Sequence, residues 1–358
     1  MAHFIRAAAC HVSPVFLSAK ATTEKAIGLI HEAAKRKAKL IVFPETYIPA
    51  FPLWSSLRAP TENHDLFHRM VKESVFADGN EVQALRQAAQ ETNTIVSIGI
   101  SEKVPYSSAT LFNSNILIGT QGEILNHHRK LVPTFFEKLT WSPGDGHGLV
   151  VSPTPFGKIG NLVCGENTNP LARYSLMAQG EQIHISSWPP VWPTRHSTTQ
   201  DHGPTSDLHQ KKGVNYDNVA ANRVRSAAHC FEAKCFGISC AAYLDPQTVD
   251  IVSEGAQNAD LVRRTLETSQ RAVTMFLDPT GTLLPGFTAR NDAEAPADYL
   301  QTEEGILYAD MNLDDCIEGK QYHDVVGGYQ RLDVFELKVN RTRRSPAVFN
   351  DSSLALEN

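Results

Sequence analysis

The sequence predicts an α/β protein in which two mixed β-sheets are covered by helices. The first observation is the order of segments, since a strand-like run at 4–12 is followed by a helix-like run at 18–37 and a buried strand at 40–45. The second is a hairpin pattern, an apolar run, a turn with glycine and another apolar run, at 118–125 and again at 277–284. Because hairpins join antiparallel strands, this repeat favours mixed sheets in two related halves over one purely parallel sheet.

The other elements follow from local patterns. In the first helix, alanine, leucine and isoleucine recur at helical spacing, and basic residues occupy the last turns, where the helix dipole favours them. Residues 46–63 are rich in proline and aromatic residues, so we expect a loop. Further helices are expected at 64–76, 79–92, 171–179 and 215–235. Further strands are expected at 94–102, 110–119, 123–131, 159–164, 182–187, 237–243 and 306–311.

The chain of 358 residues is expected to form a single domain over residues 1–335, because no linker-like stretch separates the two halves. After about residue 335 the sequence turns basic and then polar. Residues 336–358 are therefore predicted to be a C-terminal arm that is disordered or lies at a subunit interface.

Composition excludes several classes of protein. A net charge of -6 without a long basic run argues against nucleic-acid binding, and no apolar run reaches the roughly 20 residues that span a bilayer. The N-terminus is too interrupted by polar residues for a signal peptide, and six cysteines in such a chain do not form a disulfide framework. We expect a cytoplasmic protein. The even spacing of Cys230, Cys235 and Cys240 matches no metal-ligand pattern, so no metal is expected there.

A cysteine stands at a predicted strand-to-helix corner. The apolar run from Ile159 to Val163 stops at Cys164 and Gly165. Such a corner favours a nucleophilic thiolate when a base is near, and glycine lets a substrate approach the backbone. A buried cysteine is more often a small hydrophobic residue, so the corner alone does not establish a catalytic site.

Two charged residues end other apolar strands. Glu45 ends the apolar run at 40–45, and Lys130 ends the strand at 123–131. Either charge alone is best explained by a side chain that reaches solvent. Because strand ends of an α/β sheet meet at a common edge, Glu45, Lys130 and Cys164 together predict a shared site.

Three blocks of the sequence resemble the nitrilase superfamily of carbon-nitrogen hydrolases, and within it the true nitrilase branch. The blocks are FPET at 43–46, HRKLVPTFFEKLTWSPGDG at 128–146 and CGENTNPLARYSLMAQGEQIHISSWP at 164–189. The resemblance runs in order from residue 4 to about 335. It implies an α-β-β-α sandwich and a Glu-Lys-Cys triad of Glu45, Lys130 and Cys164. Glu137 matches the family's additional glutamate near the site, which reasoning from the residues alone takes for a helix-face charge.

The resemblance implies hydrolysis of a small nitrile to a carboxylic acid and ammonia through a covalent thioimidate and thioester, with no cofactor and no metal. It also implies a homodimer that builds into a larger homo-oligomer or helical filament. Gly165 stands where many nitrilases have tryptophan, which leaves more room or moves the substrate. Gly328 stands where histidine is common, which weakens the inference about the oligomer.

Tyr47, Trp54 and Trp188 are candidates to line the substrate pocket together with Gly165, although ordinary core packing explains these aromatic residues equally well. Three alternatives remain. The triad can serve an amidase or carbamoylase, or a nitrile or cyanide hydratase that releases the amide. A catalytically silent binding or scaffold protein is the third. Phenylacetonitrile-like or aliphatic nitriles are the first substrates to test.

Overall fold

A computed structural model of the chain describes residues 4–197, 215, 217–290, 293–343 and 345–347. In spatial order, the first sheet consists of β12 (Ala293–Ala297), β11 (Gly286–Arg290), β14 (Gly305–Asn312), β1 (Phe4–His11), β2 (Leu40–Val42), β3 (Ile95–Lys103), β4 (Leu111–Ile118) and β5 (Ile124–Arg129). The second consists of β13 (Tyr299–Leu300), β10 (Thr274–Leu277), β9 (Phe236–Ala241), β8 (Ile183–Trp188), β7 (Gly157–Val163) and β6 (Ser152–Thr154).

The helices lie between these strands in the chain. The α-helices are α1 (Ala19–Lys35), α2 (Trp54–Leu57), α3 (His64–Glu73), α4 (Asn80–Thr92), α5 (Pro170–Met177), α6 (Asn218–Ala233), α7 (Pro246–Ser253), α8 (Ala259–Thr268) and α9 (Asp315–Tyr322). The short 3-10 helices are η1 (Pro60–Glu62), η2 (Phe135–Leu139), η3 (Gly146–Gly148) and η4 (Cys164–Thr168).

Both sheets are mixed, as predicted. β1, β2 and β3 run parallel in the first sheet, and β7, β8 and β9 run parallel in the second. β4 and β5 are antiparallel, and the turn between them contains Gly122 with a φ of +76°, a conformation that glycine adopts without a steric penalty. Since β4 reverses the chain once and β5 reverses it again, β5 ends at the same edge of the sheet as β2 and β3.

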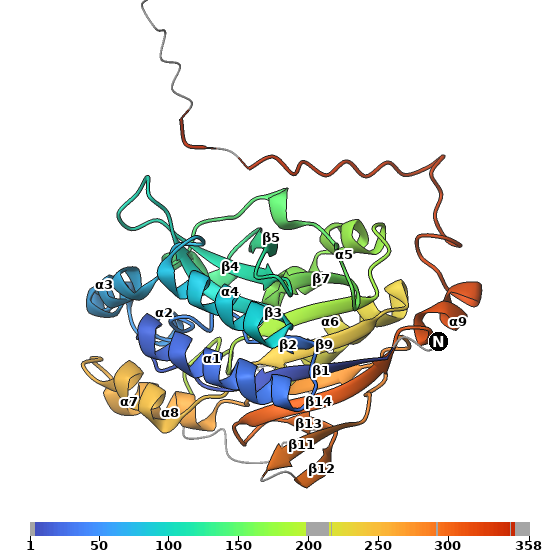
Figure 1. Cartoon of the computed structure of the whole chain (residues 1–358). Helices are drawn as coiled ribbons and strands as arrows, with labels where there is room; N and C mark the ends of the chain where they lie inside the picture. The colour runs from blue at the N-terminus through green and yellow to red at the C-terminus, as the bar shows by residue number, and fades with distance from the viewer. Residues whose placement is uncertain (1–3, 198–214, 216, 291–292, 344, 348–358) are drawn as a thin grey trace, which may run out of the picture.

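The two sheets pack face to face, and helices cover both outer faces (Figure 1). The core between the sheets draws on β1, β2 and β14 from one sheet and on β7 to β10 from the other. Helices α1 and α4 pack side by side on the outer face of the first sheet. Helices α5 and α6 cover the outer face of the second. The predicted α-β-β-α sandwich is therefore confirmed.

The second predicted hairpin is only partly formed. Gly281 makes the turn with a φ of +78°, but beyond it the pairing consists of an isolated bridge between Leu277 and Leu283. Helices α7 and α8 were not predicted, although a capping signal precedes the first of them. Asp245 accepts a hydrogen bond from the Thr248 N–H at 2.8 Å, and Pro246 occupies the first helical position.

After α9 the described residues continue along the outside of the molecule as an extended arm (Figure 1). Arg343 anchors its far end, donating to the Asp145 carboxylate at 3.0 Å and to the His127 carbonyl oxygen at 3.0 Å. The domain boundary at residue 335, and the disorder or interface role of the arm, stay predictions. Residues 344 and 348–358 lie outside the described part of the chain.

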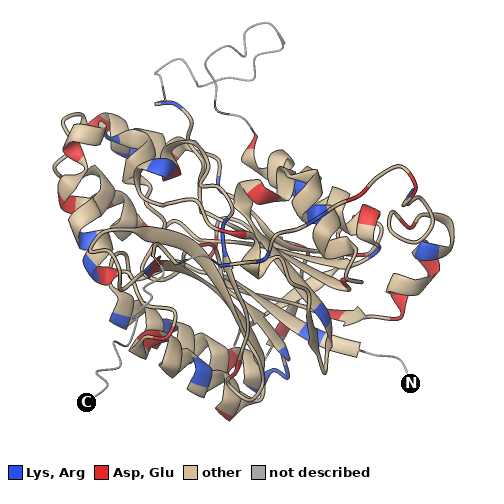
Figure 2. Cartoon of the chain, turned by 90° about the horizontal axis from the view of Figure 1, so that it is seen from above, with Lys and Arg blue, Asp and Glu red and all other residues tan. Residues whose placement is uncertain are grey.

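Charges of both signs are interspersed over the outer helices (Figure 2). Among the described helices, none is long and apolar enough to cross a bilayer.

Candidate active site

Three strand ends bring the predicted residues together. Glu45 follows β2 and Lys130 follows β5 in the first sheet, and Cys164 follows β7 in the second. A carboxylate oxygen of Glu45, one of Glu137 and the Cys164 Sγ all lie within 4.8 Å of one another. The site therefore spans the junction of the two sheets.

Glu45 is held on one side and free on the other. Its buried Oε1 accepts hydrogen bonds from Asn113 Nδ2 at 2.7 Å and from Lys130 Nζ at 2.8 Å. Its Oε2 is buried without a hydrogen-bond partner among the described residues. Gly99 of β3 lets the Glu45 loop approach, because a Cβ there would lie 2.2 Å from the Thr46 backbone nitrogen. An unsatisfied carboxylate oxygen is costly in a protein interior, so Oε2 is available to accept a hydrogen bond from a ligand.

Lys130 lies between two carboxylates. Besides Glu45 Oε1, its Nζ contacts Glu137 Oε1 at 2.9 Å and Oε2 at 2.7 Å. Burial alone would lower the pKa of Lys130, but Glu137 and Glu45 outweigh burial and raise it well above the ordinary value. Gly144 is needed beside it, because a Cβ at this position would lie 2.5 Å from the Lys130 carbonyl oxygen. The lysine is thus a fixed positive charge.

Glu137 is fully buried, and a capping box holds it at the start of η2. Its Oε2 accepts from the Thr134 N–H at 3.0 Å, and the Thr134 side chain accepts from the Glu137 N–H in return. Burial raises the pKa of Glu137 to about 7, since the Lys130 ammonium only partly offsets burial and the Glu45 carboxylate adds to it. Near neutral pH the site therefore contains a carboxyl group that gains or loses a proton readily.

Cys164 occupies a strained corner. It has a φ of +50°, a left-handed conformation that is uncommon for a residue with a side chain. Burial raises the pKa of the Cys164 thiol above its ordinary value, Glu45 raises it further, and Lys130 opposes both. Cys164 is thus a thiol at rest, and a nucleophilic attack by its sulfur would require a base to take the proton.

The site does not suit a metal ion. Glu45, Glu137 and Cys164 could offer ligand atoms, but the Lys130 ammonium hydrogen-bonds both carboxylates and so fills the place that a cation would take. The six cysteines of the chain are free and buried.

The four residues expected to bind substrate lie in different surroundings. Tyr47 lines a narrow cleft beside Glu45, and Trp188 packs in the same apolar cluster as Cys164. Trp54 belongs to the hydrophobic core next to the cleft. Its ring contacts Phe16, a residue that lines the cleft, in an edge-to-face arrangement. Gly165 faces Thr134, because a Cβ there would lie 2.6 Å from the Thr134 Oγ1.

An aromatic cluster adjoins Glu137 and was not predicted. The Phe136 ring stacks on Trp192 with centroids 4.3 Å apart, and Phe51 meets Phe136, Trp141 and Trp192 edge-on. Phe51 also lines the cleft beside Glu45. The cleft is therefore bordered by flat apolar side chains.

Sequence reasoning also missed the polar residues that hold the reactive ones. Asn113 orients Glu45 through its hydrogen bond to Oε1. Glu166 accepts from the Val163 N–H at 2.8 Å and the Leu131 N–H at 2.5 Å, which ties the strand before Cys164 to the segment after Lys130. A polar side chain within an otherwise buried segment was the signal in the sequence that could have identified Asn113 and Glu166.

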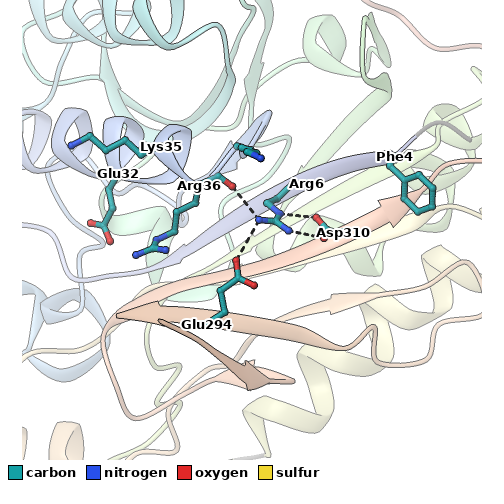
Figure 3. Close-up of a pocket in the computed structure, with 8 residues that line it drawn as sticks. Phe4, Arg6, Glu32, Lys35, Arg36, Glu294 and Asp310 are labelled. Carbon is teal, nitrogen blue, oxygen red and sulfur yellow. Dashed lines mark hydrogen bonds and ion pairs between the residues drawn. The ribbon is translucent and has the colours of Figure 1, made fainter. Parts of the chain in front are cut away.

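A wider hollow, of about 670 Å³, lies between the end of α1 and the strands β1, β14 and β12 of the first sheet (Figure 3). Arg6 in its wall forms a two-point ion pair with Asp310, at 2.8 and 2.9 Å, and lies 3.5 Å from Glu294. The residues that line this hollow do not include Glu45, Lys130, Glu137 or Cys164, so it is separate from the candidate active site.

Comparison with known proteins identifies the family and the fold. The profile of the carbon-nitrogen hydrolase family matches residues 6–321. An arylacetonitrilase of Hypocrea virens is 32% identical over 341 residues, which cover 94% of this chain and 92% of that protein. An aliphatic nitrilase of Rhodococcus rhodochrous is 29% identical over 96% of this chain and 82% of its own length. The crystal structure of a carbon-nitrogen hydrolase from Helicobacter pylori G27 has the same fold, with a TM-score of 0.63 at 19% identity over 93% of this chain and 97% of that one.

Proposed function

Since this chain belongs to the carbon-nitrogen hydrolase family, we propose that it hydrolyses an organic nitrile to the carboxylic acid and ammonia, with Cys164 as the nucleophile. The observation that carries the proposal is the free Oε2 of Glu45 in a buried cluster with the Cys164 Sγ and a lysine-bound second carboxylate. The relatives named as nitrilases support a nitrile rather than an amide as the substrate.

In the first step, the Cys164 sulfur attacks the nitrile carbon. A C–S bond forms, one π bond of the nitrile breaks, and its electrons move to nitrogen. Glu45 Oε2 takes the thiol proton and delivers it to that nitrogen, which gives a thioimidate. Lys130 and the Gly165 N–H stabilise the charge that develops on nitrogen, and such donors can each contribute about 3 kcal/mol.

In the second stage, two waters complete the hydrolysis. Glu45 removes a proton from the first water as it adds to the thioimidate carbon, and the tetrahedral species then expels ammonia and leaves an acyl thioester. A second water attacks the thioester, releases the carboxylic acid and regenerates the thiol. Glu137 holds Lys130 in place and, with a pKa near neutrality, is suited to pass a proton to the departing nitrogen.

We propose that the substrate carries an apolar, arylaliphatic or aliphatic tail, because aromatic side chains border the narrow cleft beside Glu45. Tyr47 and Phe51 line it beside Glu45, and the aromatic cluster continues to Phe136, next to Glu137. Trp188, Trp54 and Gly165 are proposed to shape the same pocket. Aromatic walls favour flat apolar groups because such surfaces bury well against each other.

The test is to incubate the purified protein with arylaliphatic, aliphatic and aromatic nitriles, cyanide and matched amides, and to measure ammonia, acid and amide separately. We expect acid and ammonia from nitriles. Turnover of amides but not of nitriles would assign the protein as an amidase or carbamoylase instead. Amide as the main product from a nitrile or cyanide would assign a hydratase.

The variant Cys164→Ala tests the nucleophile. We expect it to lose turnover and keep its circular dichroism spectrum. Cys240→Ala is the matched control, because Cys240 is also fully buried but lies between the sheets. Activity in Cys164→Ala equal to that of the control would remove the proposed role.

We further propose that the protein is cytoplasmic and forms a homodimer that builds into a larger homo-oligomer or filament. Apolar side chains are exposed on α6, on α9 and on the arm, for example Val224, Ile317 and Phe335, which supports an interface between copies. Size-exclusion chromatography of Val224→Asp beside the wild type tests the assembly, and an unchanged elution volume would count against α6 as an interface.

A further inference from the structure

A chain of buried hydrogen bonds runs beneath Cys164, and the proposed mechanism does not use it. Asn167 Nδ2 donates to the Cys164 carbonyl oxygen at 3.0 Å and to the Leu162 carbonyl oxygen at 3.2 Å. Asn167 Oδ1 lies 2.8 Å from His184 Nε2 and 3.0 Å from Ser186 Oγ. Each of these side chains is about 1% exposed. The asparagine thus links the backbone of the nucleophile to the strand β8.

The contacts fix the orientation of the Asn167 amide. Because its NH₂ group faces two carbonyl oxygens, its Oδ1 must be the acceptor for His184, and His184 Nε2 must carry a proton. The other ring nitrogen, Nδ1, lies 2.8 Å from Glu181 Oε1.

Glu181 and His229 complete the chain. Glu181 Oε2 lies 2.6 Å from His229 Nε2, and the rings of His184 and His229 stack with centroids 3.6 Å apart. Burial would raise the pKa of Glu181, but the two histidines outweigh it and hold the pKa at about 2. Both carboxylate oxygens are taken by the histidines, so a metal ion between Glu181, His229 and Cys235 would have to break these bonds. The cluster is better suited to holding His184 than to binding a ligand.

This chain of hydrogen bonds ends at the peptide group between Cys164 and Gly165. The carbonyl of Cys164 and the N–H of Gly165 belong to one planar trans peptide, so they point in opposite directions. Gly165 is the second residue of η4, and its N–H has no acceptor within that helix. Fixing the direction of the carbonyl therefore also fixes the direction of this N–H.

We propose that Asn167, held by His184 and Glu181, is a positioning residue that aims the Gly165 N–H at the atom on which negative charge develops. The inference rests on the proposed function, in which this N–H stabilises the charged intermediates. A hydrogen-bonded peptide holds its direction in spite of the left-handed corner at Cys164, and a donor fixed before the reaction loses no energy to reorientation.

Two substitutions at His184 test this chain. His184→Leu removes one of the two donors to Asn167 Oδ1 and leaves Ser186 Oγ in place, whereas His184→Gln can keep both donors, the first through its amide. Thr23→Val on α1 is the matched control, because it removes a buried side-chain hydrogen bond in the other outer layer. We expect kcat for the best nitrile to fall about 10–100-fold in His184→Leu with KM within twofold, to recover at least partly in His184→Gln, and to stay unchanged in the control.

Two further measurements separate positioning from other roles. Alkylation of Cys164 by iodoacetamide develops no oxyanion, so its rate should stay within about twofold of the wild type in both His184 variants. An aldehyde adds to the Cys164 sulfur, and the thiol proton goes to the carbonyl oxygen, which gives a hemithioacetal whose oxygen needs the Gly165 N–H. We expect phenylacetaldehyde to protect Cys164 from alkylation about tenfold less strongly in His184→Leu.

The outcomes are distinct. If alkylation falls in parallel with kcat, the chain acts on the thiol itself and the inference is wrong. Equal losses in His184→Leu and the control would reduce the chain to a contribution to stability, and would also overturn it. A wild type that hydrolyses no nitrile but shows the weakened aldehyde adduct in His184→Leu would refute the proposed function and support the positioning role. Asn167→Asp, which places an oxygen against the Cys164 carbonyl, repeats the test should His184→Leu fail to fold.

Discussion

Glu137 should make the stability of this protein depend on pH, and Glu137→Gln should remove that dependence. Burial raises the pKa of Glu137 from 4.5 to about 7. A carboxyl group with a raised pKa in the folded state stabilises the fold below its unfolded pKa, and this stabilisation is lost as pH rises through the folded pKa. At about 1.36 kcal/mol per pH unit, the total is about 3 kcal/mol.

Most of this change falls in an accessible range. Between about pH 5 and about pH 8.5, linkage predicts that the wild type loses about 2.5 kcal/mol of unfolding free energy relative to Glu137→Gln. Glutamine resembles the protonated carboxyl group, so the two proteins should be closest in stability near pH 5. The measurement is urea unfolding followed by circular dichroism at several pH values in this range, with the difference between the proteins plotted against pH.

The matched control is Glu102→Gln. Glu102 is also a buried carboxylate, but His127 and Arg129 outweigh burial and lower its pKa to about 2. Its contribution is fully present above pH 4.5 and disappears only as pH falls toward 2, so the titration of Glu102 itself adds no slope to the difference between wild type and Glu102→Gln over the same range. A flat difference for Glu137→Gln as well would refute the raised pKa and the proton-transfer role that depends on it.

Three further changes have defined outcomes. Asn113→Leu removes the hydrogen bond that orients Glu45. We expect kcat/KM to fall about 10–100-fold, since hydrogen bonds to charged groups contribute about 1.5–3 kcal/mol. Wild-type kinetics would show that Lys130 alone suffices to orient Glu45. Gly99→Ala places a Cβ against the backbone beside Glu45 and should destabilise the fold by about 3 kcal/mol in thermal unfolding, whereas an unchanged Tm would show that the loop can move. Gly165→Ala should lower turnover because of its clash with the Thr134 Oγ1, and adding Thr134→Ala should restore part of it; strictly additive losses would show that the two residues do not interact.

The sequence predicted the residues whose position follows from strand geometry. Glu45, Lys130 and Cys164 each stand at the end of a predicted strand, and strands that run the same way end at the same edge, so their proximity was predictable. Glu137 was identified only through the family resemblance, because a charge in a short 3-10 helix looks like a surface residue. The pair Thr134 and Glu137, spaced as a capping box, was the signal for it.

Other parts of the site depend on contacts between distant segments. Asn113 and Glu45 are 68 residues apart, and His229 and Glu181 are 48 residues apart, so no local pattern brings either pair together. The strand register decides which polar side chains of β4 and β8 face inward at the site. Such partners become predictable only after the sheets have been aligned.

The location of the site across both sheets links activity to the docking of the two halves. Glu45 and Lys130 lie on one sheet and Cys164 on the other. A compact state that keeps its helices and strands but loosens the core between the sheets therefore separates the proposed base from the proposed nucleophile. Such a state would retain its far-ultraviolet circular dichroism and lose turnover. Catalysis in this protein is therefore a direct measure of tertiary packing, and it should fail before the secondary structure does.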